Sequence, residues 1–499
     1  MRLFTPEAMR AADARAVELG YPSLLLMEAA GRAVAEAALA SWPEARSYAV
    51  VAGKGNNGGD GLVAARWLRL WGREVRVFAP EGHRGDAALA RAALEAHLEI
   101  EPLEDLDLHG AEVVVDALFG TGLARALEGV WAEYVARINA SAARVVAVDV
   151  PSGLPHAPHV EADLTVALAG LKPVHVFYPA RSACGRIQLA PIGMPSELLD
   201  PRELPELLEP AALRALLPAR PGHAHKGAVG RVLVVGGAPE YTGAPALAAL
   251  GAYRAGAGLV TVAYPSDARV EPPLEAVRLP VSRWQDACLF EAKAEALAVG
   301  MGGGSGGGAA ARAALKLKKP TVLDADALYP EVVKAYATAA VPTVITPHPG
   351  EAARLLETGV GTVVQDPLGA ACELARRFRT TAVLKGGPTV VCEPGRSAVN
   401  TTGNPAMASG GVGDVLAGAI AAFLAAGLSP WDAARVGVYL HGLAGDQVGS
   451  VGLLAHEVAN ALPQARARLA RGEVVPFWDS GLLSRDRPPC GRSPRSAGP

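Results

Sequence analysis

Short runs of β-branched and apolar residues alternate with alanine-rich amphipathic stretches along the first 150 residues. Each short run is a candidate strand, and each longer stretch with apolar residues three or four positions apart is a candidate helix. The expected strands are 47–52, 74–79, 111–118 and 144–150, and the helices between them are 60–72, 84–97 and 129–140. Two more helices precede the series, the first beginning at Thr5-Pro6 with a capping hydroxyl and a first-turn proline. This alternation predicts a Rossmann-like, three-layer α/β/α domain with a parallel sheet covered on both faces.

The same alternation restarts in the second half of the chain. The expected strands there are 231–235, 259–263, 296–299, 321–324, 343–346 and 381–385, and the residues before 475 are mostly helical by pattern. Prolines 201, 205, 210, 218 and 221 separate the halves, because proline ends helices and stiffens connections. We therefore expect two tandem α/β domains, 1–205 and 210–478, followed by a disordered tail, 479–499, rich in Arg, Pro and Ser.

Composition narrows the class of protein. The 47 basic and 50 acidic residues give a net charge of −3. The chain therefore has no overall positive electrostatic field that would attract nucleic acid or an anionic membrane. The N-terminus lacks the apolar core of a signal peptide, and the longest apolar run, 415–428, is too short to cross a bilayer. The five cysteines are far apart without CxxC spacing, so neither a disulfide framework nor a zinc site is expected. We expect a cytoplasmic protein with no nucleic-acid or membrane partner.

A glycine-rich loop, GKGNNGGDG at 53–61, joins the first strand to a helix. Glycines let the backbone approach a ligand closely, and a helix N-terminus directs unpaired N–H groups at an anion. The loop contains GxGxxG, which is also compatible with a tight turn that binds nothing. Asn56, Asn57 and Asp60 add polar groups that a plain turn would not need. A Rossmann dehydrogenase would need an acid about 20 residues beyond the glycines, and Glu74 there stands at the wrong end of its strand.

Two more strands of the first half end in acidic residues. Asp116 precedes Gly120-Thr121-Gly122, and Asp149 precedes Pro151-Ser152-Gly153. A single Asp at a strand end is usually a cap or turn former. Because ligands bind beyond the carboxyl ends of parallel strands, three polar strand ends together predict one shared crevice.

The motifs GKGNNGGDG, VDALFGTGL and VDVPSG, in this order, resemble those of the NAD(P)H-hydrate epimerase family over roughly residues 1–200. The resemblance implies that the substrate is bound by Asn56, Asn57, Gly58, Gly59, Asp60, Gly120, Thr121, Gly122, Leu123, Ala124, Arg125, Ala126 and Asp149. It also implies a K⁺ ion ligated by Asn57, Asp116 and Ser152, whose oxygen atoms suit such a cation. Lys172 stands where the family has a lysine, although a surface lysine would look the same in sequence. Inverting a carbon beside a ring nitrogen needs a general acid–base group, for which Asp149 is the first candidate and Lys172 the second.

The most informative loop of the second half is 400–414, which opens an apolar helix. A glycine run at a helix N-terminus makes a nest of N–H groups for a phosphate, and Asp414 inside it could accept a proton from an attacking hydroxyl. Alternatively, Asp414 only stabilises the helix dipole. The segment 385–389 offers a phosphate or ribose contact or is a simple turn. Asp324-Ala325-Asp326 resembles a metal pair or a strand-end turn, and His348 alone would more often be a solvated loop residue.

Together KGAVGRVLVVGG, TPHPGE, LKGGPT and NPAMASGGVGD resemble the ADP-dependent NAD(P)H-hydrate dehydratase family, which has a ribokinase-like α/β fold, over residues 210–475. The resemblance implies that the hydrated nucleotide is held by Ala244, Gly303, His348 and Asp414. It implies that ADP is held by Lys385, Gly386, Gly387, Pro388, Thr389, Asn404, Gly410, Gly411 and Gly413. The chain departs from the family pattern at Val412, in the GMGGG loop 300–304 and at Tyr329, and Val412 removes a hydroxyl near the phosphates.

The two resemblances imply one bifunctional repair enzyme, an isomerase and a lyase. It would epimerise hydrated NADH and NADPH from R to S and dehydrate the S epimer with ADP, giving AMP and phosphate. K⁺ would serve the first domain and Mg²⁺ the diphosphate in the second. We also expect a homo-oligomer. The rival interpretations are a ribokinase-like small-molecule kinase that uses ATP, and a first domain that only binds or scaffolds.

Overall fold

The computed structural model describes residues 1–499 except 124, 221, 223–228 and 479–499. The described chain divides into two compact units, Met1–Arg202 together with 476–478, and Glu203–Val475. The division falls slightly before the expected 205–210 boundary, because the short strand β7 (Glu206–Leu207) pairs with a strand of the second sheet. The expected disordered tail, 479–499, and the motif residues 225–227 lie outside the described residues.

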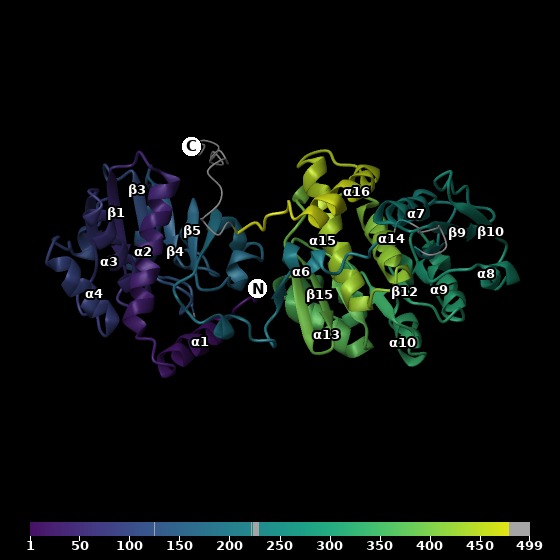
Figure 1. Ribbon diagram of the computed structural model, residues 1–499, viewed down its shortest axis with the longest axis horizontal. Helices are drawn as coiled ribbons and strands as arrows, with labels where there is room; N and C mark the ends of the chain where they lie inside the picture. The colour runs from purple at the N-terminus through teal and green to yellow at the C-terminus, as the bar shows by residue number, and fades with distance from the viewer. Residues whose placement is uncertain (124, 221, 223–228, 479–499) are drawn as a thin grey trace. The chain divides into compact units, whose positions relative to one another are not determined.

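The first unit is built on a six-stranded sheet in the order β2-β1-β3-β4-β5-β6, in which all pairings are parallel (Figure 1). The strands are β1 (Ser47–Ala52), β2 (Glu74–Phe78), β3 (Val113–Ala117), β4 (Arg144–Val148), β5 (Leu164–Leu168) and β6 (Arg186–Ala190). The prediction of a parallel sheet is confirmed. The sequence pattern missed β5 and β6, because no α-helix separates them from β4 or from each other and the strand–helix alternation therefore stops.

Helices cover both faces of this sheet. They are α1 (Pro6–Glu18), α2 (Ser23–Ser41), α3 (Asn56–Leu70), α4 (Asp86–Glu95) and α5 (Val130–Ala140). On one face α5 packs Val135 and Ile138 into a core with Val114 of β3. On the other face α3 approaches the sheet at Gly61, where a Cβ atom would lie 2.4 Å from the Cβ of Ala117. Thr5 caps α1 as expected, accepting a hydrogen bond from the Ala8 amide at 3.2 Å.

The second unit contains a ten-stranded sheet in the order β10-β9-β8-β11-β12-β13-β14-β15-β16-β7. Its strands besides β7 are β8 (Arg231–Val235), β9 (Leu259–Pro265), β10 (Val277–Val281), β11 (Ala296–Val299), β12 (Thr321–Leu323), β13 (Thr343–Ile345), β14 (Thr381–Leu384), β15 (Thr389–Glu393) and β16 (Arg396–Asn400). All neighbours are parallel except that β15 runs antiparallel to both β14 and β16. The expected six strands are confirmed. The pattern missed β7, the largely exposed edge strand β10 and the β15–β16 hairpin.

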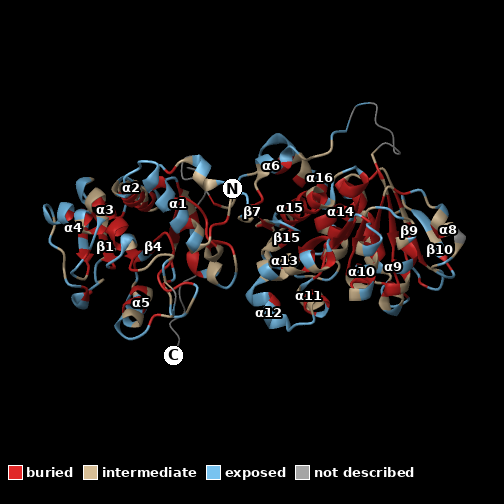
Figure 2. Cartoon of the chain, turned by 90° about the horizontal axis from the view of Figure 1, so that it is seen from below, coloured by how far each residue is buried: buried red, intermediate tan, exposed pale blue. Residues whose placement is uncertain are grey.

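The core of the second unit lies around α14 (Val412–Ala425) and α15 (Pro430–Val448), which are mostly buried along their length (Figure 2). The other helices are α6 (Pro210–Arg214), α7 (Gly243–Ala255), α8 (Ala287–Glu291), α9 (Gly307–Leu315), α10 (Pro330–Thr338), α11 (Pro349–Leu356), α12 (Val360–Gln365), α13 (Pro367–Phe378) and α16 (Ala455–Arg471). α14 packs closely on α7 because Gly418 has no side chain. A Cβ atom there would lie 1.9 Å from the carbonyl oxygen of Ala248. Among the described helices, none is both long and apolar enough to cross a membrane.

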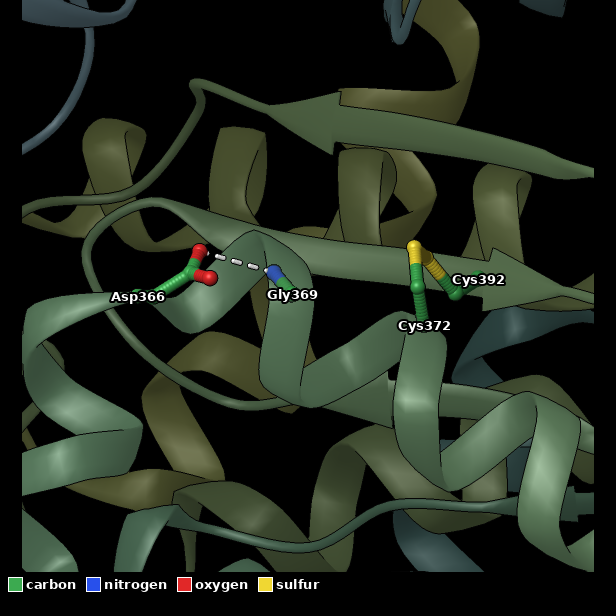
Figure 3. The surroundings of a disulfide bond; sticks show 4 residues. All are labelled: Asp366, Gly369, Cys372 and Cys392. Carbon is green, nitrogen blue, oxygen red and sulfur yellow. Dashed lines mark hydrogen bonds between the residues drawn. A yellow bond between two sulfur atoms is a disulfide. The ribbon is translucent and has the colours of Figure 1, made fainter.

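One disulfide bond corrects the expectation from cysteine spacing. It joins Cys372 on α13 to Cys392 on β15, whose Cα atoms lie 5.1 Å apart (Figure 3). The two residues are 20 positions apart in sequence and become neighbours only because α13 packs on β15. Spacing along a chain cannot reveal such a pair, since the helix–sheet packing decides it. Cys184 and Cys288 are free.

Candidate functional site

A cavity of about 1100 Å³ lies in the first unit, beyond the carboxyl ends of β1, β3, β4 and β5. The predicted site residues that line it are Asn56, Asn57, Asp60, Gly120, Thr121, Gly122, Leu123, Arg125, Asp149 and Lys172. Gly58 and Gly59 do not line it; Cβ atoms there would lie 1.9 Å from the Gly53 carbonyl oxygen and 2.7 Å from the Met27 side chain. Ala126 is not part of the lining either, and Ala124 lies outside the described residues. The three polar strand ends therefore converge on one cavity.

Lys172 and Asp149 form a buried ion pair in this cavity. The Lys172 ammonium donates to Asp149 Oδ1 at 2.5 Å and to the Leu168 carbonyl oxygen at 2.7 Å. The Leu168 amide also donates to Asp149 Oδ1, at 2.9 Å. Lys172 is 2% exposed, so it is not a surface lysine. A buried charge of this kind is tolerated only with a partner in good geometry. Asp149 itself adopts a left-handed backbone conformation, φ 62°, which is uncommon for a residue with a side chain.

His175 supports the pair from behind and was not found from the sequence. Its Nε2 lies 2.7 Å from the Asp149 carbonyl oxygen, and its Nδ1 accepts a hydrogen bond from the Lys172 amide at 3.0 Å. Burial, together with the Lys172 charge, lowers the pKa of His175 to about 4. The ring is therefore neutral near pH 7, with Nε2–H as the donor. A lone histidine in an apolar stretch carries no sequence signal for this role.

Asp13, Asp60 and Asp86 also line the cavity, and the pKa values of the first two are perturbed. Burial raises the pKa of Asp60 well above its usual range, with smaller contributions from Asp149 and Asp13. Burial also raises the pKa of Asp13. Asp13 is on α1 and was missed, because one acid in an amphipathic helix looks like part of its solvent face.

The three residues expected to ligate K⁺ lie near the end of β3 (Asp116), in the first turn of α3 (Asn57) and in the loop after β4 (Ser152). Asp116 is fully buried and accepts hydrogen bonds from the Ser152 hydroxyl at 2.6 Å and the Ser152 amide at 2.8 Å. Burial raises the pKa of Asp116 to about 6. The Nδ2 atom of Asn57 is buried with no hydrogen-bond partner in the described structure. A half-turn of the amide about its Cβ–Cγ bond would present the oxygen atom at this position instead. A buried carboxyl with only neutral donors, beside an unpartnered amide, fits a monovalent cation.

In the second unit, Asp414 lies in the first turn of α14, a helix that begins directly after Gly411, whose φ is 87°. Burial and the negative charges of Asp324, Asp326 and Glu351 together raise the pKa of Asp414 to about 8, although Lys385 acts in the opposite direction. A carboxyl that only stabilised the helix dipole would have a lowered pKa. The environment instead gives Asp414 the proton affinity of a general base acting near neutral pH.

Lys385 connects these acids. Its ammonium donates to Asp324 Oδ1 at 2.8 Å and lies 3.8 Å from Glu351 Oε2. Asp324 also accepts from the Thr346 hydroxyl at 2.8 Å, and Asp326 accepts from the Gly304 amide at 2.9 Å. Both aspartates are thus engaged by the protein. In the described part of the chain, no group of three or more His, Cys, Asp or Glu side chains is arranged to hold a metal ion.

The other residues predicted to hold the hydrated nucleotide lie in loops or at the first residues of helices; Ala244 is the second residue of α7. His348 caps α11, with Nδ1 accepting from the Gly350 amide at 3.0 Å and Glu351 closing the capping box. Gly302 packs closely on Ala244, because a Cβ atom added at position 302 would lie 2.9 Å from the Cβ of Ala244. Gly303 precedes the short helix Gly304–Gly306.

The expected ADP loops show two local features. Thr389 donates to the Gly386 carbonyl oxygen at 3.0 Å, so the 385–389 segment closes as a turn. Asn404 accepts from the Ala406 amide at 3.0 Å. A Cβ atom at Gly413 would lie 3.3 Å from the Lys385 ammonium, so this glycine keeps the approach to the lysine open.

Comparisons with known proteins match both halves of the chain. Residues 23–174 match the family model described as YjeF-related protein N-terminus, and residues 232–464 match NAD(P)H-hydrate dehydratase. The bifunctional NAD(P)H-hydrate repair enzyme Nnr of Moorella thermoacetica is 38% identical over 93% of this chain and 96% of its own length. That of Escherichia coli is 36% identical over 89% of this chain and 90% of its own. The crystal structure of the ADP/ATP-dependent NAD(P)H-hydrate dehydratase of Bacillus subtilis, co-crystallised with ATP and Mg²⁺, is 31% identical. It covers 53% of this chain and 98% of its own, with a TM-score of 0.48.

Proposed function

Because the chain belongs to the family of bifunctional NAD(P)H-hydrate repair enzymes, we propose that it restores hydrated NADH and NADPH in two steps. The first unit interconverts the R and S epimers of the hydrate. The second unit dehydrates the S epimer, converting ADP to AMP and phosphate. The observation that carries the proposal is that each unit holds a buried acid with a lysine beside it, at Asp149–Lys172 and at Asp414–Lys385.

The first reaction needs a proton to be given and taken at the hydroxylated carbon beside the ring nitrogen. The Asp149–Lys172 pair lies on the wall of the cavity, where it can contact that part of the substrate. The pair can give or take a proton without leaving an unpaired charge in the buried site. His175 holds the Asp149 backbone in place, because its Nε2 contacts the Asp149 carbonyl oxygen.

The second reaction begins with a proton transfer at Asp414. Its carboxylate takes the proton of the ring hydroxyl, and the oxygen attacks the terminal phosphorus of ADP, so that AMP leaves. The ring nitrogen lone pair then expels phosphate, and the neighbouring carbon loses a proton to restore the double bond. The Lys385 ammonium next to Gly413 can hold a phosphate oxygen. Mg²⁺ would supply further positive charge to the diphosphate when bound.

K⁺ fits the first unit at Asn57, Asp116 and Ser152. It would balance the buried Asp116 carboxyl and join the loops that follow β1, β3 and β4, one of which carries Asp149. The expectation of a cytoplasmic homo-oligomer without nucleic-acid contacts also stays a proposal. Sedimentation velocity with and without added nucleic acid tests the assembly and the nucleic-acid parts of it.

The decisive experiment supplies the full chain with an R and S mixture of hydrated NADH and either ADP or ATP. The near-ultraviolet absorbance of the reduced nicotinamide ring should return for the whole mixture with ADP. If the absorbance returned for only part of the mixture, the proposed dehydration would stand and the proposed epimerisation would be refuted. Consumption of ATP with no gain in absorbance would favour a kinase instead.

A further inference from the structure

Four carboxyl groups, two ammonium groups and two guanidinium groups line the cavity of the first unit, and three of the acids and one of the lysines influence one another's charge. Asp13 comes from α1, Asp60 from the start of α3, Asp149 from the loop after β4 and Lys172 from the segment after β5. Lys172 is paired directly with Asp149 at 2.5 Å and acts on Asp13 and Asp60 only through its charge. This group of four residues therefore contains two acids beyond the one that the lysine pairs with.

The position of α1 beside this pair is built into the fold. The segment before α1 forms a parallel bridge between Leu3 and Leu171, and the Phe4 amide donates to the Leu171 carbonyl oxygen at 2.8 Å. Leu171 directly precedes Lys172. The Phe4 ring also fills the space beside Gly170, where a Cβ atom would lie 2.6 Å from it. These contacts hold the start of α1 against the backbone that carries the lysine.

One face of α1 contributes to the cavity wall. Met9, Asp13 and Val17 recur at four-residue spacing, which places them on one side of a helix, and all three line the cavity. Asp13 is exposed to the cavity, whereas Asp60 is only 9% exposed. Of the two extra acids, Asp13 is the one that a ligand can reach. No described residue donates a hydrogen bond to it. It also lies before residue 23, where the match to the family model begins.

We propose, given that the first unit is the epimerase, that Asp13 is the general acid of epimerisation. Its carboxylic acid gives a proton to the hydroxyl of the hydrated ring. The C–O bond breaks, its electron pair leaves with the oxygen as water, and the ring nitrogen lone pair forms a C=N bond. Water then adds to the other face and forms a new C–O bond. The Asp149 carboxylate takes its extra proton, and exchange through solvent returns a proton to Asp13.

The charges around Asp13 suit this cycle. Partial burial and the negative charge of Asp149 raise the pKa of Asp13, while Lys172 lowers it. The protonated form thus persists to higher pH than for an ordinary aspartate. Once its proton is given away, the Asp13 carboxylate and Asp149 both lie near the cationic ring and stabilise it.

The test is Asp13→Asn in the full chain, with Glu18→Gln as the matched control. Glu18 is an exposed acid on the same helix, outside the cavity lining. Epimer exchange is followed by NMR without ADP, so that dehydration does not consume the substrate. Asp13→Asn should lower kcat about 10²–10⁴-fold, the usual contribution of a positioned acid, with KM nearly unchanged. Glu18→Gln should match the unaltered chain.

Two further readouts separate an acid from a structural residue. Asp13→Glu keeps the carboxyl group and should therefore recover activity. The decline of kcat/KM toward high pH should be present in Asp13→Glu and absent in Asp13→Asn. In water enriched in heavy oxygen, each exchange should place the label on the ring. Full exchange in Asp13→Asn, inactivity of Asp13→Glu equal to that of Asp13→Asn, or exchange without label would overturn the inference. No exchange by the unaltered chain would instead refute the proposed epimerase function.

Discussion

Replacing Asp414 by asparagine should stabilise the ligand-free protein at alkaline pH while removing dehydration activity. Burial raises the pKa of Asp414 from 3.8 to about 8. Between these values the folded state binds more protons than the unfolded state, so stability falls as the pH rises. Each pH unit in this window costs about 1.4 kcal/mol for one proton. From about pH 5 to about pH 8 the ionisation of this one group should therefore cost at most about 4 kcal/mol.

Asparagine keeps the size and polarity of the side chain but has no proton to lose. The difference in unfolding free energy between Asp414→Asn and the unaltered chain should therefore grow with pH, in favour of the variant. Urea unfolding at about pH 5 and about pH 8 measures it. Glu271→Gln, which removes an exposed loop carboxyl, is the control and should change stability by no more than about 0.5 kcal/mol at either pH. In the dehydration assay Asp414→Asn should lose about 10²–10⁴-fold in rate.

A stability difference that stays constant between the two pH values would show that Asp414 is not the buried acid described above. A variant that becomes relatively less stable at high pH would reverse the sign of the argument. Near-normal dehydration by a folded Asp414→Asn protein would remove Asp414 from the mechanism, whatever its effect on stability.

Four further predictions concern other parts of the chain. Asp149→Asn should abolish epimer exchange but leave dehydration of the S epimer intact, measured separately with each epimer; unchanged exchange would place the chemistry elsewhere. Asp116→Ala should weaken the K⁺ dependence of exchange, checked by titrating KCl against a constant ionic strength. Replacing Cys372 and Cys392 together by alanine should cost about 3 kcal/mol, as expected for a 20-residue separation, in urea unfolding without reductant. The two units, expressed separately, should each unfold cooperatively, since each has its own sheet and core.

Much of the local structure could be predicted from the sequence. The strands ending at Asp116 and Asp149 were recognisable because a buried parallel strand is a short β-branched run, and the residues after its carboxyl end must form a loop. Their convergence on one cavity could be expected from the rule that parallel strands place their carboxyl ends together. The strands β5, β6 and β15 were missed because no α-helix separates them from the strand before, so the strand–helix alternation used to recognise strands stops there.

The sequence by itself determined the α/β class and the family to which the chain belongs, and it predicted which loops carry the chemistry. Only the tertiary structure decided which groups act on each other. The pairing of Lys172 with Asp149, the placement of Asp13 beside them and the Cys372–Cys392 bond all join separate elements. So does the crowding of Asp324, Asp326 and Glu351 around Asp414. Proton affinity depends on burial and on charges a few ångströms away, and these distances arise only when the helices pack on the sheets.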